Sequence, residues 1–504
     1  MLKESKTVQE RTQRTKVFKT TLKPNKLINK SSIYITNDVI EIDDLIDSEL
    51  TKTPVKSGKG NFCKKDEAKH NYASSATMLK NPDMIMIPNK VKRLIEKHLP
   101  KPMLDMIHGG EKNAENREVA VELCFLFLSQ LSSTYRNIKN GSNPHGWKDL
   151  RAEYLRQLLW IDEKTYQNVI HALEYSYMDG PIIEWINHMA GLHSRKYRLG
   201  LAFRGKGFSA YDLKTDSVRE LSKKSCERKF KIADNNIICR NLLLFYNTIT
   251  LPTIEEIEEE ARRLIKEGYQ NKKGKRLIFR NKKGNKYFLD LANLSFVEDA
   301  VKIFKYLTEN GLIIPRPGND KSGGRIVDSL VLMPSWIRKL IKINGQPIKE
   351  ADYSCLHPNI AMFLYGGNVQ NLQHTDLCID LGVDEIIVKK EHLSFLNKEI
   401  WQMKQSPLFN YYQKHEPIML NAIIKEKNGS EYGYKITSRR LFAKEVEIMT
   451  EVVLRLNEEG IFVGYIYDAL FFDPQYSEKV VETMNEVAAE FSVFTTAKLE
   501  HKIS

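Results

Sequence analysis

Residues 340–358 read LIKINGQPIKEADYSCLHP, and this stretch decides the fold of the C-terminal part of the chain. Asn344-Gly345 is a strong turn dipeptide between two extended runs, which predicts a β-hairpin. The second run ends at Asp352, and a turn into a helix over 359–365 is expected to follow. The sequence therefore predicts a carboxylate at the carboxyl end of a strand, beside exposed backbone carbonyls.

Residues 460–474 read GIFVGYIYDALFFDP and predict a second, strongly apolar hairpin. One strand runs to Tyr467, the other includes 470–472, and Asp468 stands at the tight turn between them. A carboxylate in such apolar surroundings is costly unless it is paired or bound to a metal ion. Asp468 is thus a candidate metal ligand, and the alternative is that it merely forms the turn. Amphipathic spacing predicts helices before and after the hairpin, over 438–457 and 477–491.

The chain has 504 residues, and its 77 Lys and Arg exceed its 64 Asp and Glu, for a formal net charge of +13. A basic excess favours a polyanionic partner, most often nucleic acid, although a generic basic surface is an equal alternative. A hydrophobic content of 42% is enough for sizeable cores, and about three domains are expected. No uncharged apolar stretch reaches the ~18 residues of a membrane span, so no membrane partner is expected.

The cysteines and the N-terminus indicate a cytoplasmic protein. No two cysteines form a C-x-x-C pair, which indicates neither a zinc ribbon nor a redox motif. They are expected to be free thiols in a reducing compartment. The N-terminus lacks the apolar core of a secretory signal. The cysteines are Cys63, Cys124, Cys226, Cys239, Cys355 and Cys378.

Residues 1–80 are expected to be a basic, largely irregular arm. Residues 1–30 carry nine Lys and Arg against two Asp and Glu, with few large apolar residues. Such an arm can touch the phosphates of a nucleic acid, or it can be a simple tail.

Residues 81–205 are expected to form a mainly helical domain. Helical patterns over 116–136, 148–158 and 163–175 precede short extended runs over 181–186 and 196–199. This order resembles the winged-helix domains of plasmid and phage replication proteins, which implies that 163–175 is a recognition helix. The alternative is a small helical packing domain. The residues offered to nucleic acid would be Lys164, Thr165, Gln167, Asn168 and His171 on the helix, and Arg195, Lys196 and Arg198 on the wing.

Residues 206–335 are expected to be a thumb-like or connecting region that contains a basic ribbon. Residues 271–288 read NKKGKRLIFRNKKGNKYF, with Gly-containing turns and interleaved aromatic residues. This composition suits contact with a nucleic acid backbone, and the alternative is a solvated hairpin. The basic residues of the ribbon are Lys272, Lys273, Lys275, Arg276, Arg280, Lys282, Lys283 and Lys286.

The two acidic motifs resemble those of right-hand nucleic acid polymerases. The opening Asp352-Tyr353-Ser354 is similar to the first catalytic motif of family A DNA polymerases, and the Ser-x-Leu-aromatic-Pro ending to that of family B. Tyr467-Asp468-Ala469 resembles the His-Asp-Glu hairpin of family A and the His-Asp-Ser of single-subunit RNA polymerases. It departs from the family A pattern at the first and third positions. The whole first motif also resembles that of uncharacterised polymerase-like proteins of mobile elements.

The resemblance implies an α+β fold and a DNA polymerase activity. Residues 336–504 would form a palm, with an antiparallel sheet and helices, and helical fingers. The enzyme would bind a nucleic acid template and primer and add nucleoside triphosphates to a 3′-hydroxyl. Two Mg²⁺ or Mn²⁺ ions, about 3.5–4 Å apart, would be held by the side chains of Asp352 and Asp468 and the carbonyl of Tyr353.

Further residues of the resemblance imply a nucleotide site. Residues 388–397 resemble the fingers helix whose lysine grips the triphosphate, which implies Lys389 or Lys390. The family's Arg, four residues before that Lys, is replaced by Glu385 or Ile386, and the rival phosphate contacts are Lys404, Arg439 and Arg440. An ordinary exposed charged helix is the alternative. Tyr467, beside the second motif, is a further candidate.

His357 lies five positions after the first catalytic Asp. In family A and B polymerases a bulky residue at this position faces the 2′ position of the incoming sugar, and single-subunit RNA polymerases have Gly there. The resemblance therefore implies a DNA-making enzyme, and the alternative is a packed histidine at a helix start.

Other functions remain open at this point. The chain could be a single-subunit-type RNA polymerase or a terminal transferase. A two-metal nuclease could use the same carboxylates, but such nucleases usually bring three or four acidic ligands. A non-catalytic replication initiator or DNA-binding protein with a decayed palm is the non-enzymatic alternative.

Overall fold

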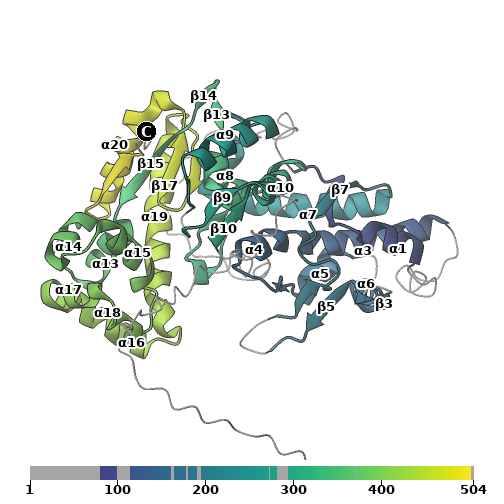
Figure 1. Ribbon diagram of the computed structural model, residues 1–504, viewed down its shortest axis with the longest axis horizontal. Helices are drawn as coiled ribbons and strands as arrows, with labels where there is room; N and C mark the ends of the chain where they lie inside the picture. Colours follow the sequence, from purple (N-terminus) through teal and green to yellow (C-terminus); the bar gives the residue numbers. More distant parts are fainter. Residues whose placement is uncertain are drawn as a thin grey trace, which may run out of the picture. The chain divides into compact units, whose positions relative to one another are not determined.

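A computed structural model describes residues 80–98, 114–160, 164–177, 180–189, 194–271, 273–280, 293–368 and 371–500 (Figure 1). The predicted basic arm before residue 80 lies outside these ranges. The described chain is mixed α and β, mostly helical, with several small sheets that are antiparallel except for one two-stranded pair. None of its helices combines the length and apolar character that crossing a membrane would require.

The apolar hairpin and the strand that carries Asp352 belong to one four-stranded antiparallel sheet, whereas the Asn344-Gly345 hairpin belongs to a separate sheet of order β14-β13-β8. The strand order of the four-stranded sheet is β16-β17-β15-β18, so strands far apart in the sequence lie next to each other. Along β15, Ala351 and Tyr353 are buried, and Asp352 between them is exposed, as the period of two in a strand requires. The strands are β15 (Lys349–Ser354), β16 (Gly464–Ile466), β17 (Ala469–Phe472) and β18 (Thr496–Leu499).

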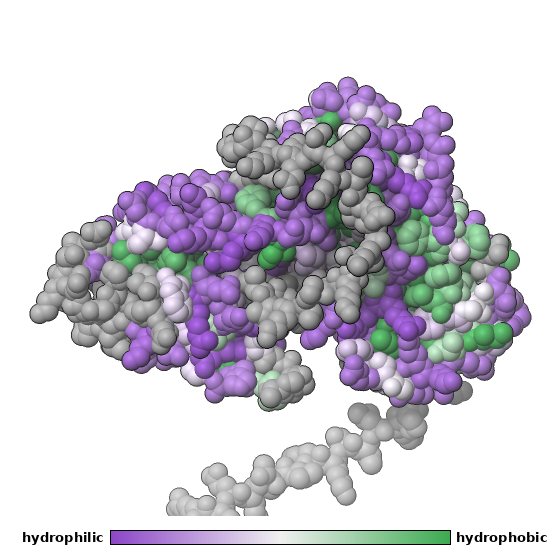
Figure 2. Space-filling view, turned by 180° about the vertical axis from the view of Figure 1, so that it is seen from behind, coloured by the Kyte–Doolittle hydropathy of each residue, from purple (hydrophilic) through white to green (hydrophobic). Residues whose placement is uncertain are grey.

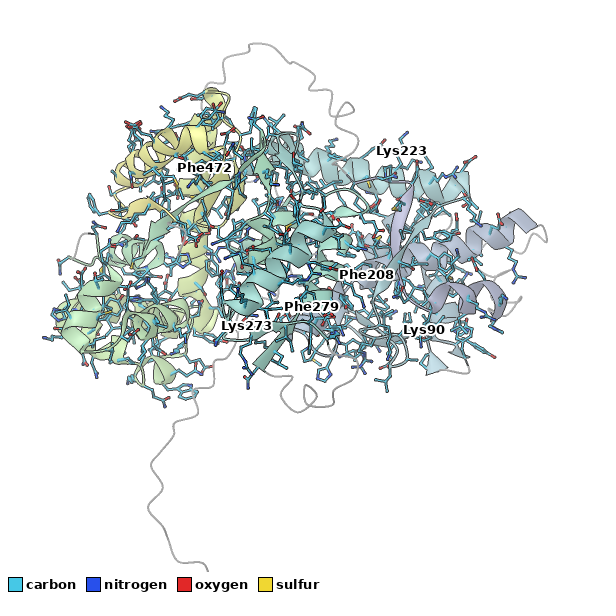
Figure 3. All side chains as sticks on the ribbon, turned by 45° about the horizontal axis from the view of Figure 1, so that its top comes forward. Lys90, Phe208, Lys223, Lys273, Phe279 and Phe472 are labelled. Carbon is cyan, nitrogen blue, oxygen red and sulfur yellow. The ribbon has the colours of Figure 1, made fainter. Side chains whose placement is uncertain are left out.

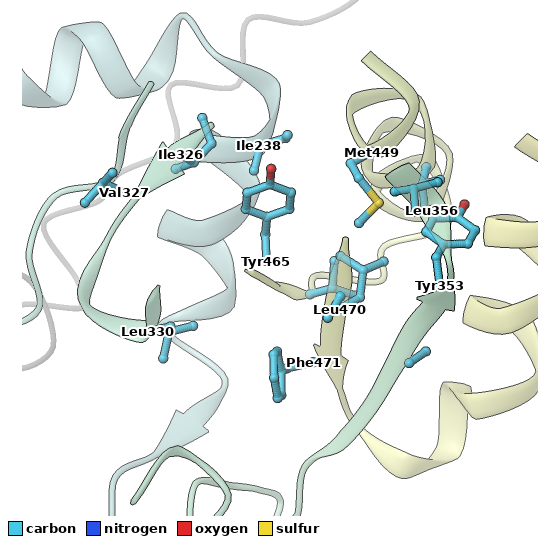
Figure 4. Packing of buried hydrophobic residues seen from close by; sticks show 14 of the residues in the cluster. Ile238, Ile326, Val327, Leu330, Tyr353, Leu356, Met449, Tyr465, Leu470 and Phe471 are labelled. Carbon is cyan, nitrogen blue, oxygen red and sulfur yellow. The ribbon is translucent and has the colours of Figure 1, made fainter. Parts of the chain in front are cut away.

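Apolar side chains fix this sheet against α19, α20 and α8. Tyr353 packs on the α20 side, where its hydroxyl donates to the carbonyl of Met484 at 2.5 Å. Figure 4 shows Leu470 and Phe471 in the core. Burying each such side chain contributes about 1.5–3 kcal/mol, which holds the strand register. The helices are α8 (Ile237–Phe245), α19 (Ile436–Glu458) and α20 (Ser477–Glu490), and the last two agree with the predicted ranges within two residues.

A block of helices lies in the sequence between β15 and α19. Lys427 is buried inside it, and its Nζ donates to the carbonyls of Leu396, Lys398 and Tyr434 at 2.9, 2.9 and 2.7 Å. Figure 2 shows apolar surface on the side where these helices lie, and Ile379, 83% exposed, belongs to them. The helices are α13 (Leu356–Tyr365), α14 (His374–Leu381), α15 (Glu385–Phe395), α16 (Ile400–Met403), α17 (Pro407–His415) and α18 (Pro417–Gly429).

The first part of the described chain has its own buried core, from Ile85 to Val218. A small antiparallel sheet there has the order β2-β6-β5. The helix predicted over 116–136 is in fact two helices with Ser133 between them. The elements are β1 (Met84–Pro88), α1 (Val91–His98), α3 (Ala114–Ser132), α4 (Thr134–Asn140), β2 (Lys148–Asp149), α5 (Ala152–Leu158), α6 (Thr165–Glu174), β5 (Ile183–Ile186), β6 (Lys196–Leu199) and β7 (Phe208–Asp212).

The middle of the chain contains the predicted Asn-Gly turn and part of the basic ribbon. Asn344 and Gly345 both have positive φ, 50° and 77°, which is the conformation of a two-residue type I′ turn. Within the ribbon, residues 276–278 form a strand whose partner, over 294–296, is parallel. The elements are α7 (Asp216–Asp234), α9 (Ile254–Lys266), β9 (Arg276–Ile278), β10 (Leu294–Phe296), α10 (Val297–Thr308), β13 (Lys342–Ile343) and β14 (Gln346–Pro347).

The remaining elements are short. They are β3 (Ser176–Tyr177), β4 (Gly180–Pro181), β8 (Ile249–Thr250), β11 (Arg316–Pro317), η4 (Asp320–Ser322), β12 (Ile326–Val327), α11 (Ser329–Leu332), α12 (Ser335–Arg338), η5 (Gly433–Lys435) and η6 (Pro474–Tyr476).

Candidate active site

Asp352 on β15 lies next to the β16–β17 turn that carries Asp468, although more than a hundred residues separate the two in the chain. In the β15–β17 register Asp352 faces Ala469, the residue that follows Asp468. The backbone N–H of Tyr353 donates to the carbonyl oxygen of Asp468 at 3.4 Å. Asp468 stands at the two-residue turn between β16 and β17, as the apolar hairpin predicts.

Asp468 is a half-buried carboxylate that forms no ion pair with any described residue. Burial and the negative charge of Glu445 raise its pKa above the ordinary value, and the charges of His357 and Arg325 only partly oppose this. A carboxylate that is partly removed from water and only partly compensated by cations is destabilising. A bound cation would lower the free energy of the ionised Asp468 carboxylate. A metal ligand requires this property.

Lys498 is a neighbour of Asp352 that the sequence does not reveal. The β15–β18 register places the two residues directly opposite each other, and cross-strand partners lie on the same face of a sheet. Both are exposed. Because β18 carries no motif, only the strand pairing identifies this cation beside the first carboxylate.

Glu445 of α19 is a fully buried carboxylate at the centre of a charged cluster. Its Oε1 accepts from Nε of Arg325 at 2.8 Å, and its Oε2 accepts from Nη2 of Arg325 at 2.5 Å and from Nε2 of His357 at 2.7 Å. Burial acts to raise the pKa of Glu445, but the Arg325 charge and the bonds from His357 and Arg325 outweigh it and lower the pKa to about 2. Glu445 is therefore ionised at neutral pH.

This ionised carboxylate fixes the tautomer of His357. Nε2 must carry a hydrogen in order to donate to Glu445. The 3.1 Å approach of Arg325 Nη2 to the same nitrogen then joins two donors that share one acceptor, and it is not a hydrogen bond. The ring also packs on Phe442 at 5.5 Å between centroids, and its side chain keeps 29% exposure. The His357 ring is thus held by Glu445 and Phe442, and part of it stays exposed to solvent.

Arg325 reaches the cluster from a glycine turn. A Cβ on Gly323 would lie 2.4 Å from the backbone nitrogen of Ala443, so only glycine lets this loop meet α19 so closely. The Arg325 guanidinium lies 3.7 Å from the ring centroid of Phe442 and 4.4 Å from that of Tyr467. It therefore joins α19 to the hairpin that carries Asp468.

Tyr467 has a strained backbone. Its φ is +59°, a left-handed value that is uncommon for a bulky aromatic residue. Non-glycine residues held in this region cost about 1–3 kcal/mol and cluster at functional sites. The strain places the Tyr467 ring over Arg325, directly beside Asp468.

The lysines expected to bind a triphosphate lie on α15. Lys389 forms an ion pair with Glu385 at 2.8 Å, and both Lys389 and Lys390 are exposed. Burial raises the pKa of the Cys355 thiol to about 12, and Lys389 is among the groups that oppose the rise. Cys355 directly follows β15 and is three residues after Asp352. Because Lys389 is close enough to act on Cys355, α15 packs back toward this end of β15.

The rival phosphate contacts differ in their partners. Lys404 is exposed. Arg439 lies over the ring of Tyr432 at 3.5 Å, and Arg440 is ion-paired with Glu426 at 3.0 Å. Both arginines would have to leave these partners to bind a phosphate.

The expected recognition helix is α6, two residues shorter at its start and one at its end than predicted. Lys164, Gln167 and His171 are exposed, but Thr165 is buried, contrary to the prediction, because it falls on the apolar stripe of the helix. On the wing, Arg195 lies 4.6 Å from the ring of Trp185, and Lys196 is paired with Asp149 at 3.4 Å. Arg198 is paired with Glu184 at 2.5 Å and is already occupied.

The basic ribbon is only partly described. Lys273, Arg276 and Arg280 are exposed, and Lys275 is half-buried. Figure 3 labels Lys273 and Phe279, which come from this segment. Lys272, Lys282, Lys283 and Lys286 lie outside the described residues.

The candidate metal ligands of this site are the two carboxylates. No group of three or more His, Cys, Asp and Glu side chains with metal-binding geometry occurs among the residues that the structure describes. Carboxylate and carbonyl oxygens are hard donors, and Mg²⁺ usually takes only one or two carboxylates and keeps waters. Asp352 and Asp468, the latter without a cationic partner, fit such an ion.

Comparison with known proteins gives no relative. No protein-family model matches the chain, and no curated protein matches it.

Proposed function

We propose that the chain is a nucleic acid polymerase, and that it adds deoxynucleotides to a 3′-hydroxyl by two-metal catalysis. The observation that carries the proposal is the pairing of β15 with β17, which sets Asp352 beside the Asp468 turn. A carboxylate on a strand and another in the turn that begins the adjacent antiparallel strand, the second without an ion-pair partner among the described residues, suit a pair of divalent ions. Residues 336–504 would then be a palm with helical fingers, and 206–335 a thumb-like or connecting region.

The metal site would consist of Asp352, Asp468 and the carbonyl of Tyr353. Bound Mg²⁺ or Mn²⁺ would supply activation of the primer hydroxyl and neutralisation of the triphosphate. The chain itself contributes the orientation of the two carboxylates through the strand pairing. Lys498, directly opposite Asp352, adds a positive charge on the same face of the sheet.

The incoming nucleotide would contact both sides of this site. Lys389 or Lys390 on α15 would hold the triphosphate and stabilise the leaving pyrophosphate. His357, held by Glu445, would stand against the sugar, and Tyr467 would line the site beside Asp468. Exclusion of the 2′-oxygen by His357 is the reason that we propose deoxynucleotides.

The N-terminal part would hold the template duplex. Its element order is α3-α4-β2-α5-α6-β3-β4-β5-β6, and apart from the additional α4, β3 and β4 this order and the sheet order β2-β6-β5 support a winged helix. The exposed residues of α6 and Arg195 on the wing would then contact nucleic acid. A winged helix also fits the alternative of a replication initiator without catalysis.

Primer extension with the full chain tests the proposal. A labelled primer on a DNA template is incubated with Mg²⁺ or Mn²⁺ and each nucleotide set. We expect the wild-type protein to lengthen the primer, and Asp352→Asn and Asp468→Asn to lose more than about a hundredfold of this activity. Asp473→Asn is the matched control, because Asp473 follows the far end of β17 and an Asn can still cap η6.

Each other outcome identifies a different protein. Asp468→Asn activity within tenfold of wild type contradicts the metal assignment. Shortening of the labelled strand identifies the nuclease, and an unchanged strand the non-catalytic binder. Extension with ribonucleotides alone identifies an RNA polymerase, and extension without a template a terminal transferase.

A further inference from the structure

Basic side chains from separate segments meet around Tyr135 of α4. The Nζ atoms of Lys139 and Lys302 lie 5.3 and 6.0 Å from the centroid of the same Tyr135 ring. The two ammonium groups are therefore at most about 11 Å apart, close to the Debye length of about 10 Å at 0.1 M salt and somewhat beyond the one of about 8 Å at physiological salt. Lys139 is in the last turn of α4 and Lys302 is on α10, so the sequence gives no sign of this proximity.

A second group extends the cluster along α4. Nζ of Lys273 donates to the carbonyl of Asn140 at 3.4 Å, immediately after Lys139. Burial and the charges of Lys275 and Arg136 lower the pKa of Lys273. Burial, and after it the charges of Arg280, Lys302 and Lys206, lower the pKa of Lys139 against the effect of Asp299. We call this set the α4 basic surface: Arg136, Lys139, Lys206, Lys273, Lys275, Arg280 and Lys302.

The positive charge of this surface is poorly compensated. Asp299 is already ion-paired with Arg280, and it accepts from the Tyr135 hydroxyl at 2.9 Å. The lysines of the set form no ion pair with any residue that the structure describes. Like charges held together raise the free energy of the folded protein unless a polyanion binds to them.

The α4 basic surface begins next to the candidate active site. Nε of Arg136 donates to the carbonyl of Leu332 at 3.0 Å. Burial raises the pKa of Tyr467, and Arg136 is one of the two charges that oppose the rise. Arg136 is thus within electrostatic range of the residue before Asp468. From there the surface continues to Lys273, which Figure 3 labels near Phe279.

We infer that the α4 basic surface binds the sugar–phosphate backbone of the nucleic acid whose end lies at Asp352 and Asp468. Lysine is a flexible point charge that suits phosphates and reads no bases. Tyr135 is buried beneath the ammonium groups, so it offers no free face for base stacking. The inference rests on the proposed function only for where the strand leads, because binding is measured without catalysis.

The test is a binding experiment on the full chain in metal-free buffer. Fluorescence anisotropy of a labelled primer–template duplex with a single-stranded overhang is recorded over a range of salt concentrations. The triple variant Lys139→Gln/Lys273→Gln/Lys302→Gln is compared with Lys223→Gln/Lys224→Gln/Lys231→Gln, which removes the same charge from exposed positions on α7. Thermal melting confirms that both variants are folded.

We expect the first triple variant to bind at least about tenfold more weakly and to lower the slope of log K against log salt by about 2–3, as the loss of three phosphate contacts requires. The α7 variant should stay within about twofold. Equal losses in the two variants would mean that only net charge matters, and they would overturn the inference, as would an unchanged slope.

Lysine acetylation of the wild-type protein gives a second measurement that needs no variant. The duplex should protect Lys139, Lys273 and Lys302 and leave Lys223 reactive, and equal reactivity with and without duplex overturns the inference. Wild-type binding at this surface without any primer extension would instead refute the polymerase and leave the surface standing.

Discussion

Arg325 and Glu445 are joined by a two-point ion pair, with 2.8 and 2.5 Å between nitrogen and oxygen, although 120 residues separate them in the chain. Both Glu445 oxygens are used, and the same carboxylate receives His357. The pair lies between α19, the Gly323 turn and the Asp468 hairpin. It therefore ties together the segments that carry the candidate site.

Removing Arg325 should be strongly destabilising. In Arg325→Met the carboxylate of Glu445 stays buried without its cation, which costs about 3–5 kcal/mol. The double variant Arg325→Met/Glu445→Met should recover most of this loss, because no buried charge remains. Denaturant unfolding measures both. Arg263→Met, which breaks two exposed ion pairs on α9, should change stability little, and a similar loss there would contradict the argument.

The ion pair also predicts a pH dependence of stability. The pKa of Glu445 is about 2 in the folded protein, below its ordinary value of 4.5. The stabilisation is therefore fully present above pH 4.5 and is lost as the pH falls toward 2. The difference in unfolding free energy between wild type and Glu445→Gln should shrink by about 2 kcal/mol between pH 6 and pH 3. A constant difference over that range would mean that folding does not lower the pKa of Glu445, and would contradict the prediction.

His357 should control the choice of sugar. Wild type is expected to prefer deoxynucleotides, because the ring held by Glu445 and Phe442 overlaps a 2′-oxygen. His357→Gly should lower the ratio of kcat/KM for dNTP over rNTP by at least about tenfold, with a modest loss of dNTP use. Single-nucleotide incorporation measures the ratio. An unchanged ratio, or a wild type that uses both sugars equally, refutes the assignment.

Lys427 should be essential for the helical block. Its Nζ donates to three carbonyls, so Lys427→Met leaves one buried and two part-buried acceptors without this donor and should cost about 3 kcal/mol. Thermal or denaturant unfolding measures the loss. Lys425→Met on the exposed side of α18 is the matched control and should be nearly neutral.

The hairpins were predictable because their signals are local. An Asn-Gly dipeptide and an apolar run interrupted by Asp468 each specify a turn within a few residues, and both turns are present. Lys498 could not be predicted, because its place beside Asp352 depends on strand pairing between distant segments.

The burial of two polar residues, Glu445 and Thr165, was not predicted, although the sequence contains a signal for both. Glu445 lies on the apolar stripe of Leu441, Ile448 and Val452, where a carboxylate must be buried and needs a partner. The same spacing places Thr165 among the buried residues of α6. In both helices the helical period, when it is applied to polar residues as well as apolar ones, predicts that the residue lies on the buried face.

The central position of β15 in its sheet has a consequence for biosynthesis. Ser354 accepts a hydrogen bond from Thr495, which is made 141 residues later. At a synthesis rate of about 5–20 residues per second, β15 waits roughly 7–28 s for its neighbour β18. During this time it has an unpaired strand edge, and such edges promote aggregation. Slower ribosomes lengthen the exposure, and a truncated chain that ends before β18 never closes this edge.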